Sequence, residues 1–121
     1  MSKETTLVIG ASENPDRYSN MAIKSLVQHN KKVKAIGLRN GNVAGVQIIK
    51  EKEGFNDIHT VTLYMNDKNQ EQYEDYILGL KPERIIFNPG AENSRLAAKA
   101  REQNIKTMNA CTLVLLSTGQ Y

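Results

Sequence analysis

The sequence is poor in cysteine, in aromatic residues and in long apolar runs, and each scarcity excludes a class of protein. A single cysteine, Cys111, can form neither an intramolecular disulfide nor a cysteine-rich zinc module. No segment reaches the roughly 18 apolar residues that a membrane span needs, and the opening MSKETTLVIG lacks the form of a secretory signal. Aromatic residues make up 6%, without an interleaved basic stripe, which disfavours nucleic-acid binding. We expect one cytoplasmic domain spanning residues 1–121.

The net charge of +3 is unevenly distributed along the chain. Residues 1–50 carry eight Lys and Arg against three Asp and Glu, whereas residues 51–121 carry eight against ten. A basic first half favours an anionic ligand on that side of the molecule. The alternative is that Lys31, Lys32 and Lys34 only solvate a loop and the start of a strand.

Short β-rich runs alternate with segments of helical periodicity. The pattern predicts strands over residues 6–9, 33–37, 58–64, 84–87 and 105–108, and helices over 20–29, 66–80 and 91–103. Residues 41–45 are expected to be a loop, 46–49 a short strand or edge extension, and 110–116 a closing helix or turn. On the helix over 66–80, the side predicted to pack against the core carries Tyr73, Tyr76, Ile77 and Leu80. The side predicted to be exposed carries Glu71, Glu74 and Asp75.

Strands separated by helices imply right-handed crossovers, and therefore an α/β fold with a doubly wound, mostly parallel five-stranded sheet and helices on both faces. Open sheets of this kind bind ligands outside the carboxyl ends of their strands. The loops that follow the five strands are therefore the candidate binding loops.

The loop after the first strand runs from Gly10 to Ser19 and leads into a helix. Gly10 permits close backbone approach, and the free N–H groups and dipole of the helix favour an anion near Ser19 and Asn20. Ser12 adds a hydroxyl donor and Arg17 a charge-assisted one. The loop has one glycine, so the three-glycine dinucleotide fingerprint is absent. The alternative is a plain loop with Ser19 as helix N-cap and Arg17 in a surface ion pair.

This loop resembles that of the small stand-alone CoA-binding domain proteins of bacteria, which are similar to the CoA-binding domain of the succinyl-CoA synthetase alpha subunit. The resemblance covers Thr6 to Thr112 and rests on Gly10, Ser12, Pro15, Arg17 and Ser19, a glycine near Gly45, Asn88-Pro89-Gly90, and the cysteine after the last strand. It implies a Rossmann-like domain in which one loop cradles a CoA phosphate. The residues implied are Gly10, Ala11, Ser12, Asn14, Pro15, Arg17, Tyr18 and Ser19. The sequence departs from the family's common Asn-Pro after the second strand, where it has Gly37-Leu38-Arg39-Asn40.

Two further loops contribute candidate ligand contacts. No carboxylate follows the second strand until Glu51, which disfavours NAD, whereas Arg39 suits the phosphorylated ribose of CoA or NADP. Arg39 is otherwise a solvated loop residue. Asn88 and the backbone at Gly90 either meet the diphosphate or pantetheine of a ligand or only form a turn.

Nothing in the chain resembles a complete catalytic constellation. His29 and His59 lie far from any nucleophile with an orienting partner, and no metal-ligand spacing is present. Cys111 is either a reactive thiol at the pantetheine end of a site or a small apolar residue.

The leading hypothesis is a module that binds or senses CoA or an acyl-CoA, with no nucleic-acid or membrane partner. One alternative is a small NADP-dependent oxidoreductase, which would need Tyr18 or Cys111 as its acid or base. Another is a subunit of a homo-oligomer or larger complex that docks through the acidic helix over residues 66–80.

Overall fold

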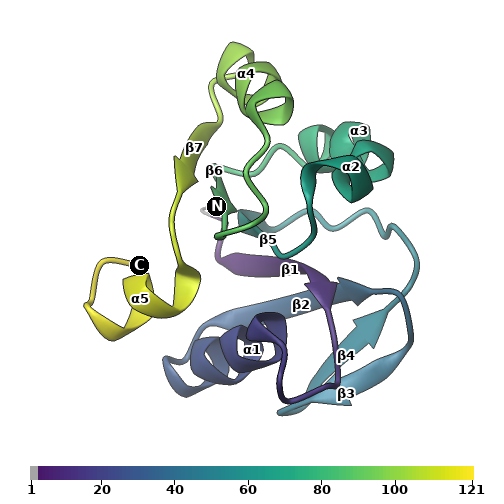
Figure 1. Cartoon of the computed structure of the whole chain (residues 1–121), viewed down its shortest axis with the longest axis vertical. Helices are drawn as coiled ribbons and strands as arrows, with labels where there is room; N and C mark the ends of the chain where they lie inside the picture. Colours follow the sequence, from purple (N-terminus) through teal and green to yellow (C-terminus); the bar gives the residue numbers. More distant parts are fainter. Residues whose placement is uncertain (1–2) are drawn as a thin grey trace.

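A seven-stranded sheet forms the centre of the molecule in the computed structural model, which describes residues 3–121 (Figure 1). The strands are β1 (Thr5–Ala11), β2 (Lys32–Gly37), β3 (Gly41–Val43), β4 (Val46–Ile49), β5 (Ile58–Leu63), β6 (Arg84–Phe87) and β7 (Lys106–Asn109). Their order across the sheet is β3-β4-β2-β1-β5-β6-β7, and every neighbouring pair is parallel except β3 and β4. The chain winds outward from β1 first to one side and then to the other, which confirms the doubly wound α/β fold.

Helices cover both faces of this sheet (Figure 1). One face carries α1 (Tyr18–Gln28) and α5 (Thr112–Ser117), and the other carries α2 (Asp67–Gln70), the 3₁₀ turn η1 (Glu71–Tyr73), α3 (Glu74–Gly79) and α4 (Ser94–Glu102). Successive side chains of β1 point alternately to the two faces of the sheet, because the side chains of a strand alternate with a period of two residues. Leu7 and Ile9 pack in the cluster with α3 and α4, and Val8 packs with α1 and α5; all three are fully buried.

The five predicted strands are all present, and a hairpin adds two more at one edge. Residues 46–49, expected to be a short strand or edge extension, form β4. The segment expected to be a loop forms β3, which pairs antiparallel with β4, and Ala44 and Gly45 make the turn between them. Both turn residues have positive φ, +51° and +85°, as the tight turns of two-residue hairpins require. Alanine rarely adopts this conformation, so the dipeptide gave no hairpin signal in the sequence.

The single helix expected over residues 66–80 is instead α2, η1 and α3 in succession. Glu74, expected on the exposed side, is only 4% exposed. Its carboxylate accepts hydrogen bonds from Arg95 (Nε, 3.0 Å), Lys99 (3.3 Å) and Asn93 (3.2 Å), so that α3 is joined to α4. The error arose because helical periodicity cannot reveal cations supplied by another helix. The acidic face proposed for docking is correspondingly smaller.

Several element boundaries differ from those expected by one to three residues. The helix α1 begins at Tyr18 rather than at residue 20. The helix α4 begins at Ser94 rather than at residue 91, because the Asn93 side chain accepts the Leu96 N–H (3.1 Å) and caps the helix there. Among residues 3–121, no helix is both long enough and apolar enough to span a membrane.

Candidate functional site

The loops that follow β1, β2, β5, β6 and β7 enclose a cleft of about 1310 Å³ at the carboxyl edge of the sheet. Ten of the eleven residues predicted to bind ligand line this cleft; Pro15 does not. The ten are Gly10, Ala11, Ser12, Asn14, Arg17, Tyr18, Ser19, Arg39, Asn88 and Gly90. They come from three loops, as expected for the switch point of a doubly wound sheet.

Two glycines allow the backbone to form the floor of this cleft. Gly10 has a φ of +96°, and a Cβ there would lie 3.1 Å from the backbone carbon of Tyr64. A Cβ on Gly37 would lie 2.3 Å from the Ala11 carbonyl oxygen, closer than real Cβ atoms come. The ends of β1, β2 and β5 therefore meet at distances that side chains would prevent.

The loop from Ser12 to Arg17 is shaped by short hydrogen bonds within itself. The Asn14 N–H donates to Ser12 Oγ (3.0 Å), and the Asp16 N–H donates to Asn14 Oδ1 (3.0 Å). The Arg17 N–H donates to the Asn14 carbonyl (3.1 Å). These three bonds hold the loop in one conformation and leave other backbone N–H groups of the segment unpaired within residues 3–121.

Unpaired donors gather where this loop enters α1. Within the described part of the chain, the backbone N–H groups of Ser12, Glu13, Tyr18 and Ser19 have no protein acceptor. The N-cap of α1 is Arg17, not Ser19, and no side chain caps the helix. The Arg17 side chain is exposed and makes no hydrogen bond or ion pair with any of residues 3–121. The helix N-terminus thus presents free N–H groups beside a free guanidinium, an arrangement suited to an oxyanion.

The loop after β2 forms the second wall of the cleft. Arg39 is exposed, and Leu38 beside it is 83% exposed. The Glu13 carboxylate accepts the Asn42 N–H (2.9 Å), which ties the loop after β1 to the start of the β3–β4 hairpin.

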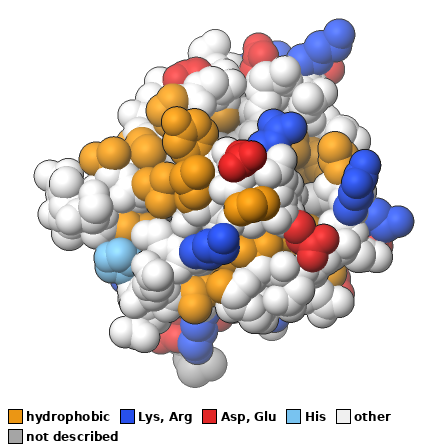
Figure 2. Space-filling model, turned by 60° about the horizontal axis from the view of Figure 1, so that its bottom comes forward, with side chains coloured by type: hydrophobic (Ala, Val, Ile, Leu, Met, Phe, Trp, Pro, Cys, Tyr) orange, Lys and Arg blue, Asp and Glu red, His pale blue; other side chains and the backbone are white. Residues whose placement is uncertain are grey.

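Apolar side chains also gather on the face of the molecule that carries α1 (Figure 2). Tyr18, at the start of α1, is 69% exposed.

The loop after β6 is internally bonded at the two positions predicted to contact ligand. The buried Asn88 amide donates to Thr62 Oγ1 (2.6 Å) and to the Leu63 carbonyl (3.0 Å) and accepts the Thr112 N–H (2.8 Å). The Gly90 N–H donates to the Glu92 carboxylate (2.9 Å). Asn88 therefore joins β5, β6 and α5, and this loop shapes the cleft without offering the donors that the sequence suggested.

Several cleft residues were not identified from the sequence. They lie in the segment after β5 and at the start of α5: Tyr64, Met65, Asn66, Asn69, Gln72, Tyr73 and Leu113. The Tyr64 hydroxyl is fully enclosed and makes no hydrogen bond within the described chain, and burial raises the pKa of Tyr64 to about 12 despite the nearby hydroxyls of Thr62 and Thr112. Cys111 is half-buried in the same cleft. Only the general position of these loops, after strand ends, could have indicated them.

The chain is similar in sequence to one protein family and in structure to several solved proteins. The family profile described as "CoA binding domain" matches residues 4–117. A crystal structure of an uncharacterized protein is similar over 100% of both chains, at 40% identity and a TM-score of 0.94. A hypothetical protein from Pyrococcus horikoshii is 21% identical, with 96% of this chain and 83% of that chain covered and a TM-score of 0.85.

A more distant similarity is to a much larger protein. The dinucleotide forming acetyl-coenzyme A synthetase 1 of Ca. Korarchaeum cryptofilum, solved with phosphate and ADP, is 12% identical, with a TM-score of 0.73. The match covers 90% of this chain but only 26% of that one, so it shows a shared fold. No curated protein matches the sequence.

Proposed function

The chain belongs to the CoA binding domain family, and we propose that it binds CoA or an acyl-CoA in the cleft at the carboxyl edge of the sheet, as a binding or sensing module. The observation that carries the proposal is the set of unpaired donors at the start of α1, which lies in the segment that matches the family. The same family supports the cytoplasmic location expected from the sequence.

A CoA phosphate would lie against the loop after β1. Free N–H groups at an uncapped helix N-terminus favour negative charge, and an unpaired guanidinium adds two parallel donors. Arg17 and the N–H groups of Ser12, Tyr18 and Ser19 supply these donors in our proposal. Arg39, on the facing loop, would meet the phosphorylated ribose. Because the two loops face one cleft, one ligand can reach both.

The rest of the cleft suits the less polar part of such a ligand. Its lining includes the apolar or aromatic side chains of Leu38, Tyr64, Met65 and Leu113, together with Cys111. The polar groups of Asn88 and Gly90 are bonded within the protein, so in our proposal they position the wall without donating to the ligand. The pantetheine arm would therefore run along a largely apolar wall toward Cys111.

Thermal unfolding in the presence of candidate nucleotides tests this proposal. A ligand at 100 times its Kd stabilises the folded state by about 2.7 kcal/mol, which raises the Tm of a domain this size by on the order of 10 °C. We expect such a shift with CoA or acetyl-CoA and not with NAD or ATP. A shift with NADP but not with CoA would overturn the proposal in favour of the oxidoreductase alternative.

An Arg17→Ala variant locates the phosphate contact. Because Arg17 is exposed and unpaired, we expect its Tm without ligand to match that of the unmodified protein. Loss of a charge-assisted hydrogen bond of about 1.5–3 kcal/mol weakens CoA binding roughly 10- to 100-fold. Lys24→Ala removes one positive charge from the same helix outside the cleft and should leave CoA affinity unchanged. Equal weakening by both variants would show that only overall charge matters.

A further inference from the structure

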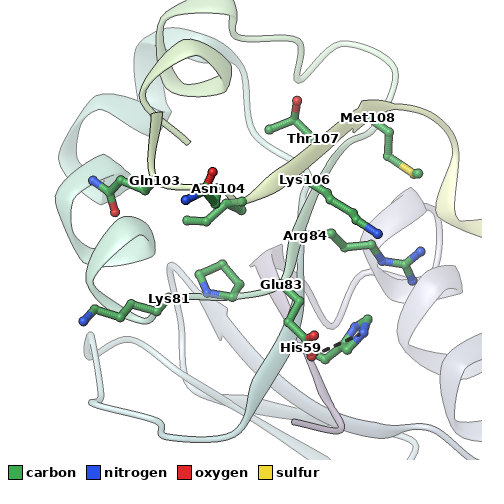
Figure 3. Close-up of a pocket in the computed structure, with 11 residues that line it drawn as sticks. His59, Lys81, Glu83, Arg84, Gln103, Asn104, Lys106, Thr107 and Met108 are labelled. Carbon is green, nitrogen blue, oxygen red and sulfur yellow. Dashed lines mark ion pairs between the residues drawn. The ribbon is translucent and has the colours of Figure 1, made fainter. Parts of the chain in front are cut away.

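A second hollow, of about 730 Å³, lies at the end of the sheet opposite to the cleft, where β5, β6 and β7 begin (Figure 3). Its charged and titratable lining consists of His59, Lys81, Glu83, Arg84 and Lys106. The lining therefore includes three cations, Lys81, Arg84 and Lys106, and one carboxylate, Glu83. The volume lies within the range of roughly 300–1,000 Å³ that small-molecule sites occupy.

Strand register places two of these cations side by side. Arg84 of β6 is the direct partner of Lys106 of β7, and Thr60 of β5 is the partner of Arg84 on its other side. Partners on neighbouring parallel strands point to the same face about 4.8 Å apart. In Figure 3 the side chains of Lys106 and Arg84 extend in the same direction from these neighbouring strands. Like charges in this arrangement repel, and a bound anion would relieve that repulsion.

No carboxylate of residues 3–121 pairs with either cation to provide this relief. Among residues 3–121, neither Arg84 nor Lys106 has an acidic group within 4.0 Å. The nearest acidic member of the hollow, Glu83, pairs with His59 (3.7 Å). Lys81 points away from the pair in Figure 3.

The guanidinium of Arg84 is held in place before any ligand arrives. Its Nε donates to Thr60 Oγ1 (2.8 Å), and its Cζ lies 4.3 Å from the centre of the Tyr121 ring. These contacts leave both terminal nitrogens without an acceptor in the described chain. A fixed guanidinium with two free nitrogens binds a planar or tetrahedral oxyanion bidentately, at little cost in conformational entropy.

We propose that Arg84 and Lys106 form a second anion site, for a small phosphorylated molecule bound through its phosphate monoester group. Arg84 holds two phosphate oxygens and Lys106 supplies the second charge. A phosphate monoester carries about −1.5 to −2 at pH 7, which matches two cations, whereas a single carboxylate leaves one uncompensated. The site is independent of the CoA cleft, because the two lie at opposite ends of parallel strands.

NMR titration of the ¹⁵N-labelled Arg17→Ala protein tests the site with the cleft's phosphate contact removed. The probes are inorganic phosphate and glycerol 3-phosphate, with acetate as a monoanion, all at matched ionic strength. We expect saturable shifts of the backbone amides at Thr60, Arg84 and Lys106 and of the Arg84 Nε–H with either phosphate. Tighter binding of glycerol 3-phosphate than of inorganic phosphate identifies the phosphorylated molecule as the preferred source. Shifts of equal size with acetate would overturn the assignment to a dianion.

Three further variants test whether Arg84 and Lys106 are the groups that bind phosphate. Lys106→Gln should weaken phosphate binding at least tenfold, and Arg84→Lys, which keeps the charge but loses the two-pronged donor, should weaken it severalfold. Lys81→Gln makes the same charge change as Lys106→Gln within the same hollow, but on a side chain that points away, and should leave the affinity unchanged. Equal weakening by both glutamine variants, or shifts confined to residues 10–19, would overturn the proposal. Because neither result depends on CoA, failure here leaves the proposed function intact.

Discussion

At the scale of single residues, Gly10 is restricted both by its backbone conformation and by a close neighbour. Its φ of +96° lies in the region that residues with a Cβ rarely adopt, and its missing side chain leaves room for the backbone of Tyr64. The sequence identified Gly10 as a close-approach residue from its place after a strand. The structure adds the reason, which is the neighbouring end of β5.

We expect Gly10→Ala to lower the free energy of unfolding by about 1–3 kcal/mol, because it combines a strained φ with a tight contact. Urea unfolding measures this change. The control is Gly54→Ala, which has nothing within 4 Å of its new Cβ and no positive φ, and should change stability by no more than about 0.5 kcal/mol. Equal effects of the two substitutions would contradict the role given to Gly10.

The position of Asn88 could be predicted from the sequence, but the hydrogen-bond partners of its side chain could not. Its position after a strand correctly predicted that it lies at the cleft. Its side chain, however, bonds to Thr62, Leu63 and Thr112, which are far from it in sequence. Whether an amide faces a ligand or the protein depends on those partners, and no local pattern specifies them.

At the scale of elements, α3 and α4 are connected by exposed cations that surround the buried carboxylate of Glu74. Glu74 accepts hydrogen bonds from Asn93, Arg95 and Lys99. The Arg95 guanidinium is the main cause that holds the pKa of Glu74 below its ordinary value of 4.5. Gln70 of α2 donates to the carbonyls of Met65 and Ala91. Both residues line the cleft, so these bonds connect the segment after β5 to the loop after β6.

This cluster makes stability depend on pH in a defined direction. A carboxyl group whose pKa is lower in the folded than in the unfolded protein stabilises the fold above the unfolded value, and this contribution disappears as pH falls through the folded value. We expect Glu74→Gln to cost about 1.5–3 kcal/mol at pH 7. The difference between the unmodified protein and the variant should shrink as pH falls below 4.5.

Urea unfolding at several pH values between about 7 and 3 measures this difference. Asp75→Asn, at the exposed neighbouring position of α3, removes the same charge without removing a hydrogen bond and should show no comparable loss. A difference between Glu74→Gln and the unmodified protein that stays constant over this range would contradict the ionic role of Glu74.

Most elements could be predicted from the sequence, because their periodicity is local. The five parallel strands and three of the helical segments lie where the apolar pattern placed them. The exceptions have two causes. The β3–β4 hairpin depends on positive φ at Ala44. The division of residues 67–79 accompanies buried polar groups whose partners lie on α4 and the loop before it.

At the scale of the whole molecule, the cleft joins the first and last loops of the fold. Arg17 follows β1 and Cys111 follows β7, yet both line one cavity. If CoA spans that cavity from phosphate to pantetheine, ligand bound at Arg17 should shield the thiol of Cys111.

We expect acetyl-CoA, which has no free thiol to consume the reagent, to slow alkylation of Cys111 by N-ethylmaleimide. At 100 times its Kd, about 1% of sites remain empty, so the rate should fall many-fold. Mass spectrometry measures the rate. The Arg17→Ala variant at the same ligand concentration should lose most of this protection, and urea-unfolded protein should show none. Full protection in the variant, or none in the unmodified protein, would contradict the proposed path of the ligand.

The alternation of strands and helices, and with it the doubly wound sheet and the edge where the candidate binding loops meet, follows from the amino-acid sequence alone. This is because hydrophobic period and turn chemistry are properties of neighbouring residues. Which polar groups are free depends on the tertiary fold, because their partners are distant in sequence. Within residues 3–121 the Arg17 side chain has no partner, the Asn88 amide is bonded to β5 and α5, and the Glu74 carboxylate is paired with Arg95 of α4. The tertiary fold also placed Arg84 beside Lys106, because strand register joins residues that no short pattern relates.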